Sequence, residues 1–342
     1  MIMKKIIFML ALTTSVALSF SSCKKKEITN KVEGIMPQKI ELQMRGGHMH
    51  GSLFHADATL SQVAFPLKNK ALVTLELQAD GKSYKPLSNE PIRLIANRVW
   101  SSEIVFSDRD NKRLNGYYTA NDKKDLFQFF LTAENVRQYT PGQAQEGATL
   151  NKSLEMMMSG FVYRDTNPEH LMFGKKNGHH HGDHDHDHGD HDHDHGDHAH
   201  AGTLRHDDDE KVELSNANIG FKGYFNNPAT QKAENFIGVR ESYVAFDLVY
   251  HFVRFATPKD KMKGNQHRNA FAWEESFNAL TLCSFKIPVR IVTKHPNDKE
   301  TLNIFFKDIA KEFQLTEEQV HEMWDEARNI PQEERKKEYY SM

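Results

Sequence analysis

The residues with the clearest chemistry form one tract, in which eleven histidines and seven aspartates occupy 18 of the 22 positions from His179 to His200. The unit GDHDHDH runs from Gly182 to His188, repeats from Gly189 to His195 and then decays. Neutral imidazole suits zinc, nickel and copper, and carboxylate oxygens complete such coordination shells. We therefore predict several weak, interchangeable metal sites, with zinc as the first expectation and nickel or copper as alternatives. The candidate ligands are His179, His180, His181, Asp183, His184, Asp185, His186, Asp187, His188, Asp190, His191, Asp192, His193, Asp194, His195, Asp197, His198 and His200.

The composition of this tract also predicts its behaviour without metal. It has almost no apolar side chains, so burial cannot offset the roughly 1 to 2 kcal/mol per residue that backbone ordering costs. We expect residues 176–211 to be a disordered loop that holds on the order of two to four ions, at about four ligands per zinc. A solubilising spacer is the alternative interpretation.

The N-terminus predicts where such a loop is placed. Lys4 and Lys5 precede an apolar run of fifteen residues, Ile6 to Phe20, which is shorter than the roughly 20 residues that a transmembrane helix needs. We interpret residues 1–22 as an export signal, to be excluded from the fold.

The end of that signal, Ser21-Ser22-Cys23, resembles the lipobox of bacterial lipoproteins, although Phe20 departs from the usual aliphatic or small residue. The resemblance implies cleavage before Cys23, lipidation of Cys23 and attachment to a membrane of the bacterial cell envelope through a tether at residues 23–35. Lys24 favours the outer membrane by resemblance to lipoprotein sorting rules. A plain secretory peptide with an incidental cysteine is the alternative.

Charge and cysteine content narrow the remaining possibilities. The formal net charge of -3, together with export, argues against nucleic-acid binding. Besides Cys23 the chain has only Cys283, which cannot form an intramolecular disulfide. Cys283 lies in an apolar strand-like run, so we expect a buried, inert thiol and a fold stabilised by an apolar core.

A second group of candidate ligands lies near the start of the chain. Gly46-Gly47 separates two strand-like runs, which is a signal for a two-residue hairpin turn. With the turn there, His48 and His50 project from one polar face about 6 to 7 Å apart, a spacing from which they can share a metal ion. Glu41 is then within reach from the opposite strand.

His55 is the third candidate ligand of this group. It falls on the other face of the expected hairpin, and a bulge at Gly51 would return it to the side of His48 and His50. If the strand instead runs straight through the glycines, His48 and His50 share the parity of Ile40 and face the core. Histidines that simply lie on a polar face are the remaining alternative.

The surrounding sequence reads as mainly β. Alternating apolar and polar residues at 40–44 and 73–78 indicate half-buried strands, and 242–255 indicates a long central strand with an apolar face at its even positions. Other expected strands are 92–97, 103–106, 126–132, 156–163, 219–225 and 279–285. Short polar turns favour antiparallel sandwich or barrel-like modules, divided into a first β-rich module at 36–175 and a second β-rich segment at 212–297. One sandwich and two domains both remain open.

The C-terminal segment, 298–342, has helical spacing instead. Apolar residues recur from Leu302 to Phe313, and Thr316 with Gln319 forms a capping box that opens a second helix. A helical hairpin packed on a sheet or on a partner is therefore expected.

The functional prediction follows from the tract and the leader. The tract resembles the histidine-rich loops of zinc-uptake solute-binding proteins and envelope zinc chaperones, over about twenty-five residues only. This resemblance implies a non-enzymatic lipoprotein that captures, buffers or hands over metal ions, with a membrane transporter as a plausible client. An accessory subunit of an outer-membrane complex is the alternative class. A metallohydrolase using His48 and His50 is the third, and it lacks an obvious clustered carboxylate base.

Overall fold

The computed structural model describes residues 34–58, 64–172, 212–226, 238–336 and 341–342. The leader, Cys23, most of the tether and the whole histidine tract lie outside the described residues. Residues 32–342 form one compact unit.

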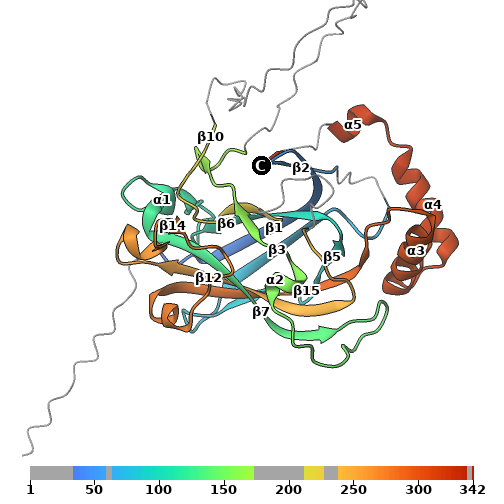
Figure 1. Cartoon of the computed structure of the whole chain (residues 1–342), viewed down its shortest axis with the longest axis horizontal. Coiled ribbons are helices and arrows are strands. Elements are labelled where there is room, and N and C mark those ends of the chain that lie inside the picture. The colour runs from blue at the N-terminus through green and yellow to red at the C-terminus, as the bar shows by residue number, and fades with distance from the viewer. Residues whose placement is uncertain (1–33, 59–63, 173–211, 227–237, 337–340) are drawn as a thin grey trace, which may run out of the picture. The chain divides into compact units, whose positions relative to one another are not determined.

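Two sheets make up most of this unit (Figure 1). The first has seven strands in the order β4-β3-β1-β6-β11-β8, with β2 paired to β1, and the second has four in the order β5-β15-β12-β7. The first sheet consists of β1 (Lys39–His50), β2 (Leu53–Ala56), β3 (Lys70–Leu77), β4 (Tyr84–Pro86), β6 (Val99–Ser107), β8 (Phe161–Tyr163) and β11 (Lys222–Phe225). The second consists of β5 (Ile92–Ala96), β7 (Phe127–Gln138), β12 (Val244–Arg254) and β15 (Thr281–Lys294).

The two sheets pack face to face around one apolar core, because each strand alternates inward and outward side chains. Ile40, Leu42 and Met44 of β1 are fully buried in the same cluster as the even-numbered residues 244 to 252 of β12. The hydroxyls of Ser102 on β6 and Tyr250 on β12 lie 3.1 Å apart, and this hydrogen bond links the sheets within the core. The predicted sandwich of mainly antiparallel sheets is confirmed.

Segments on both sides of the histidine tract build both sheets. β11 joins the first sheet between β6 and β8, and β12 with β15 supplies the middle of the second sheet between β5 and β7. The tract therefore connects parts of one sandwich. Two further pairs of short strands, β9 (Thr166–Asn167) with β10 (Glu213–Leu214) and β13 (Met262–Lys263) with β14 (Gln266–His267), lie outside the main sheets.

The expected C-terminal helical hairpin is also present, as α3 (Lys299–Phe313) and α4 (Glu317–Arg328). Asp298 caps α3, and the predicted capping box of Thr316 and Gln319 opens α4. Phe305, Phe306 and Ile309 of α3 are buried in the main core, which fixes the hairpin against the sandwich.

The shorter helices are α1 (Asn115–Thr119), α2 (Leu154–Met157) and α5 (Gln332–Lys336). In the part of the chain that the structure describes, no helix is long and apolar enough to cross a membrane.

Two details differ from the sequence-based expectation. The segment 156–163 was expected to be one strand, but its start belongs to α2 and only Phe161–Tyr163 is extended. Ser153 caps this single turn through the backbone N–H of Met156, and such a cap favours helix over strand. In addition, β5 pairs with β15 in parallel, whereas the other strand pairs of the two sheets are antiparallel.

Candidate metal site

The β1–β2 hairpin carries the second group of candidate ligands, but its turn is not at Gly46-Gly47. β1 continues straight through both glycines to His50, and the chain reverses at Gly51-Ser52, where Gly51 has φ +58°. Glycine adopts this left-handed conformation without steric cost. The predicted register is therefore wrong, and the alternative of a strand running through the glycines is correct.

Close packing explains why the glycine pair lies inside a strand. A Cβ atom on Gly47 would lie 2.1 Å from the carbonyl oxygen of His55 and 2.6 Å from the ring of Phe54. On Gly46 it would lie 3.2 Å from Nε of Arg98. These glycines allow β2 and the Arg98 side chain to approach β1, a role that glycine has in strands as well as in turns.

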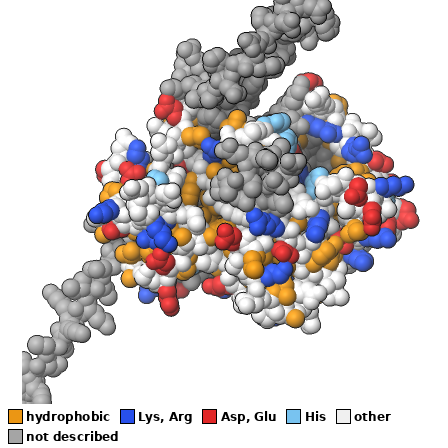
Figure 2. Space-filling model, in the orientation of Figure 1, with side chains coloured by type: hydrophobic (Ala, Val, Ile, Leu, Met, Phe, Trp, Pro, Cys, Tyr) orange, Lys and Arg blue, Asp and Glu red, His pale blue; other side chains and the backbone are white. Residues whose placement is uncertain are grey.

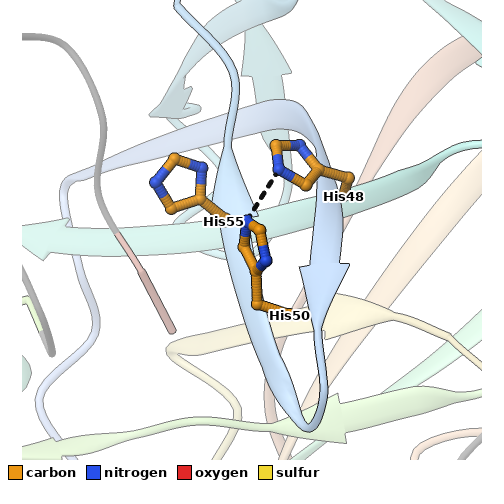
Figure 3. A group of neighbouring side chains, drawn as sticks. All are labelled: His48, His50 and His55. Carbon is orange, nitrogen blue, oxygen red and sulfur yellow. Dashed lines mark hydrogen bonds between the residues drawn. The ribbon is translucent and has the colours of Figure 1, made fainter. Parts of the chain in front are cut away.

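The straight strand brings three histidines together (Figure 3). His48 lies directly opposite His55 in the β1–β2 ladder, and His50 lies two residues beyond His48 on the same face. One ring nitrogen from each lies within 4.8 Å of the others, and the ring centroids are 4.8 to 5.4 Å apart. We call these three residues the histidine triad. The ladder thus joins His55 to the pair without a bulge.

The triad is open to solvent, contrary to the expectation that the straight strand would turn these residues to the core. His48 and His50 do share the parity of the fully buried Met44, yet both are exposed and His55 is half-buried. Beyond Gly47, β1 has passed the end of the apolar cluster that buries its first half. A water-accessible position is what an exchanging metal ion requires.

A carboxylate orients one of the three rings. Nδ1 of His48 lies 2.7 Å from Oδ1 of Asp57. An ionised carboxylate only accepts hydrogen bonds, so Nδ1 of His48 donates, and its Nε2 keeps the lone pair that a metal needs. Carboxylates that hold metal-binding histidines in this way are common around zinc sites.

Asp57 is itself held in place from two sides. Its carboxylate forms an ion pair with Arg98, and its backbone carbonyl accepts a hydrogen bond of 2.9 Å from Arg45. Glu41, the carboxylate expected from sequence, does not take part, because it lies near the start of β1 and pairs with Lys39 at 3.0 Å.

The protonation equilibria of His48 and His55 favour the neutral ligand form. Burial lowers the pKa of His48, and the positive charge of Arg98 lowers it further. Burial also lowers the pKa of His55, with additional contributions from His48 and His50. Because metal ions bind neutral imidazole, a lowered pKa means that fewer protons must be displaced near neutral pH.

The geometry suits zinc after a small adjustment. Nε2 of His48 and Nε2 of His50 are 3.0 Å apart, close to the separation of about 3.3 Å between two nitrogens bound to one tetrahedral zinc at about 2.0 Å. The ligand nitrogen atoms, one from each ring, lie within 4.8 Å of one another. Side-chain rotation can bring them to bonding distance of one ion. Three histidines leave a fourth position for water or an exchanging ligand.

The far side of the hairpin is fixed by the C-terminus. Phe54 and Met342 exchange two backbone hydrogen bonds of 3.0 and 2.9 Å, so β2 is paired on both edges. Phe54, Val99, Tyr224 and Met342 form a small apolar cluster on the side of the hairpin away from the triad. The ligands therefore stand on a supported hairpin.

Sequence reasoning missed two residues of this site, Asp57 and Arg98. Asp57 follows His55 by two positions, so strand alternation alone places both on one face. Arg98 lies directly before β6 and forms an ion pair with Asp57. Nothing in the sequence marks this pairing. The candidate ligands of the histidine tract lie outside the described residues.

Two of the described histidines away from the triad are held by other contacts. His251 lies between Thr132 and Ser284, with ring nitrogens 2.9 and 3.0 Å from their hydroxyls, and its ring stacks on Trp273. His321 packs against Phe306 at a ring distance of 4.0 Å.

The chain matches none of the protein-family models, curated proteins or solved structures with which it was compared.

Proposed function

We propose that this protein is a lipid-anchored metal-binding protein of the bacterial cell envelope, which captures zinc and buffers it or hands it over. Nickel and copper are the alternative ions. The observation that carries the proposal is the histidine triad, in which three imidazoles from two paired strands converge beside a carboxylate that orients one of them.

The triad and the tract have different roles in this proposal. The tract gathers ions loosely through many equivalent ligands, while the triad holds one ion more tightly because its ligands are fixed by the hairpin. Fixed ligands lose less side-chain entropy on binding, so a preorganised site binds more tightly than a flexible one with the same ligands. The lipid at Cys23 keeps both at the membrane, where a transporter is the proposed recipient.

We propose binding rather than catalysis as the task of the triad. A hydrolytic zinc site usually needs a base near the open coordination position. A hollow of about 420 Å³ adjoins His48, and Asp57 is the only carboxylate among the described residues that line it. Asp57 already accepts from His48 and pairs with Arg98. It is therefore engaged in orienting the ligand.

Calorimetric titration of zinc into four forms of the chain tests the proposal. These are the unmodified chain, His48→Ala/His50→Ala/His55→Ala, deletion of residues 178–202, and the two changes combined. We expect one tight site that survives the deletion and is lost in the triple variant. The matched control is His170→Ala/His267→Ala/His321→Ala, which removes three exposed histidines outside the triad.

The outcomes separate the alternatives. Loss of all tight binding on deletion of the tract would confine metal binding to the tract and refute the role of the triad. Equal losses in the triple variant and in the histidine control would show that no defined site exists. Absence of binding by the unmodified chain would refute the metal proposal as a whole.

A further inference from the structure

A second cavity lies between the triad and the C-terminal helices. It has a volume of about 290 Å³ and is bounded by the chain after β2, the end of β5, and helices α3, α4 and α5. Figure 2 shows a hollow on this face of the molecule with basic and histidine side chains at its edge. A volume of this order suits a small organic molecule.

Most of the charged side chains that line this cavity are cationic. Four cationic side chains line it, Lys68, Arg98, Arg328 and Arg335, against the single carboxylate of Asp57 within the described part of the chain. Asp57 pairs with Arg98. Arg328 and Arg335 form no ion pair among the described residues, which leaves their charge for a ligand.

Arg335 is held in position by hydrogen bonds to the backbone. Nε of Arg335 donates to the carbonyl of Ile330 at 3.1 Å, and Nη2 donates to that of Ala327 at 2.9 Å, at the end of α4. Burial lowers the pKa of Lys68, which also lines the cavity. A partly desolvated cation of this kind gains from a bound anion.

The rest of the wall is aromatic. Phe65, Phe305 and Trp324 contact one another at ring-centroid distances of 5.3 to 6.0 Å and all line the cavity. Nε1 of Trp324 is buried and has no hydrogen-bond acceptor among the described residues. A buried donor without an acceptor costs free energy, which an acceptor atom from a ligand would offset.

We propose that this cavity is a binding site for a small aromatic carboxylate, whose ring contacts the Phe65–Trp324 wall and whose carboxylate meets Lys68 and Arg328. An arginine and a carboxylate form charge-assisted hydrogen bonds, and a planar ring stacks on aromatic side chains. None of the three triad histidines lines this cavity, so its ligand would bind without displacing them, although Asp57 and Arg98, which support the triad, also line it.

Calorimetric titration of the full chain, treated with a chelator to remove metal, tests this site. The probes are benzoate and 2-naphthoate, with the uncharged amides benzamide and 2-naphthamide and the ring-free anion acetate as comparisons. We expect at least one aromatic carboxylate to bind with a Kd of about 1 mM or tighter. The amides and acetate should bind at least about tenfold more weakly, since each lacks one of the two features.

Variants locate the binding. Lys68→Gln/Arg328→Gln should weaken carboxylate binding at least about tenfold, and Arg328→Glu, on the exposed end of α4, should weaken it further without disturbing the core. Lys307→Gln, exposed on α3 and outside the cavity lining, is the matched control and should leave it unchanged. Equal binding of the amides or of acetate, unchanged affinity in the double variant, or no binding by either aromatic carboxylate would overturn the proposal.

Discussion

The contact between Asp57 and His48 makes a quantitative prediction about metal affinity. If the carboxylate orients the His48 ring, Asp57→Asn should weaken zinc binding at the triad while leaving all three imidazoles in place. The change retains the size of the side chain, and the hydrogen bond from Arg45 to the backbone of residue 57 holds the loop in position. The affinity change then reports the charge of the carboxylate.

The structure sets the expected size of the effect. The Asp57–His48 distance of 2.7 Å is that of a charge-assisted hydrogen bond, which contributes about 1.5 to 3 kcal/mol. An asparagine oxygen can still accept from Nδ1, so only part of this is lost. We expect zinc affinity to fall about tenfold for Asp57→Asn and up to about a hundredfold for Asp57→Ala, within the range seen for residues that support metal ligands.

The ion pair with Arg98 requires its own control. Arg98 is only 12% exposed, and removing the Asp57 charge leaves this guanidinium without its carboxylate, which destabilises the fold. The clean comparison is therefore Arg98→Met against Asp57→Asn/Arg98→Met. Arg98→Met alone should bind zinc as tightly as the unmodified chain or more tightly, because the positive charge of Arg98, which disfavours protonation of His48, also repels a zinc ion bound at His48.

Zinc titration of these variants, on chains that lack residues 178–202, measures the triad without the tract. Thermal unfolding of each metal-free variant confirms that the fold persists. Equal zinc affinities for Arg98→Met and Asp57→Asn/Arg98→Met would refute the orienting role of Asp57.

Three further predictions concern the hairpin, its protonation and the half-buried His251 of β12. Gly47→Ala should displace β2, reduce the free energy of unfolding by about 1 to 3 kcal/mol and remove the tight zinc site. Gly116→Ala, which has open space at its Cβ, should change neither the unfolding free energy in denaturation experiments nor the zinc affinity in titrations. Zinc affinity at the triad should change little between pH 8 and pH 7 and fall as the pH drops below about 6.5, because the pKa of His48 and that of His55 are lowered. A steep decline of zinc affinity already above neutral pH would contradict this. Burial lowers the pKa of His251 from 6.5 to about 4. Neutral His251 should therefore contribute fully to the free energy of unfolding above about pH 6.5, and this free energy should decline by about 2 kcal/mol towards pH 4, allowing for partial exposure. Denaturation of His251→Gln across this range should show a smaller dependence of the unfolding free energy on pH.

Much of the fold was predictable because the strands with the strongest alternation are those that form the core. The even positions of 244–252 and of 40–44 face inward as their pattern indicated. The parallel pairing of β5 with β15 was not predictable, since these strands are almost two hundred residues apart and periodicity carries no information about partners. The helical turn at the start of 156–163 was missed because Met-rich segments fit helix and strand equally well.

The three histidines of the triad were predictable from the sequence, whereas their geometry and the contacts of Asp57 and Arg98 were not. A Gly-Gly pair between strand-like runs is ambiguous, because glycine permits both a tight turn and the close approach of another backbone. The second property decides the structure here, since the carbonyl of His55 occupies the place of a side chain on Gly47. Shifting the turn to Gly51-Ser52 changes which residues face one another and joins His55 to His48.

Once the turn is placed, the remaining ligand environment follows from strand alternation. His48 and His50 on one strand, and His55 and Asp57 on the returning chain, are each separated by one residue, so all four project to one side of the hairpin. The pattern of two histidines, a short turn, and then a histidine and an aspartate two apart therefore places three candidate ligands beside a carboxylate. A one-residue slip in register would move His55 and Asp57 to the opposite face. The pairing of Phe54 with Met342 opposes such a slip, and Ser341 forms a β-bridge with His55, so the C-terminal residues help to hold the triad in register.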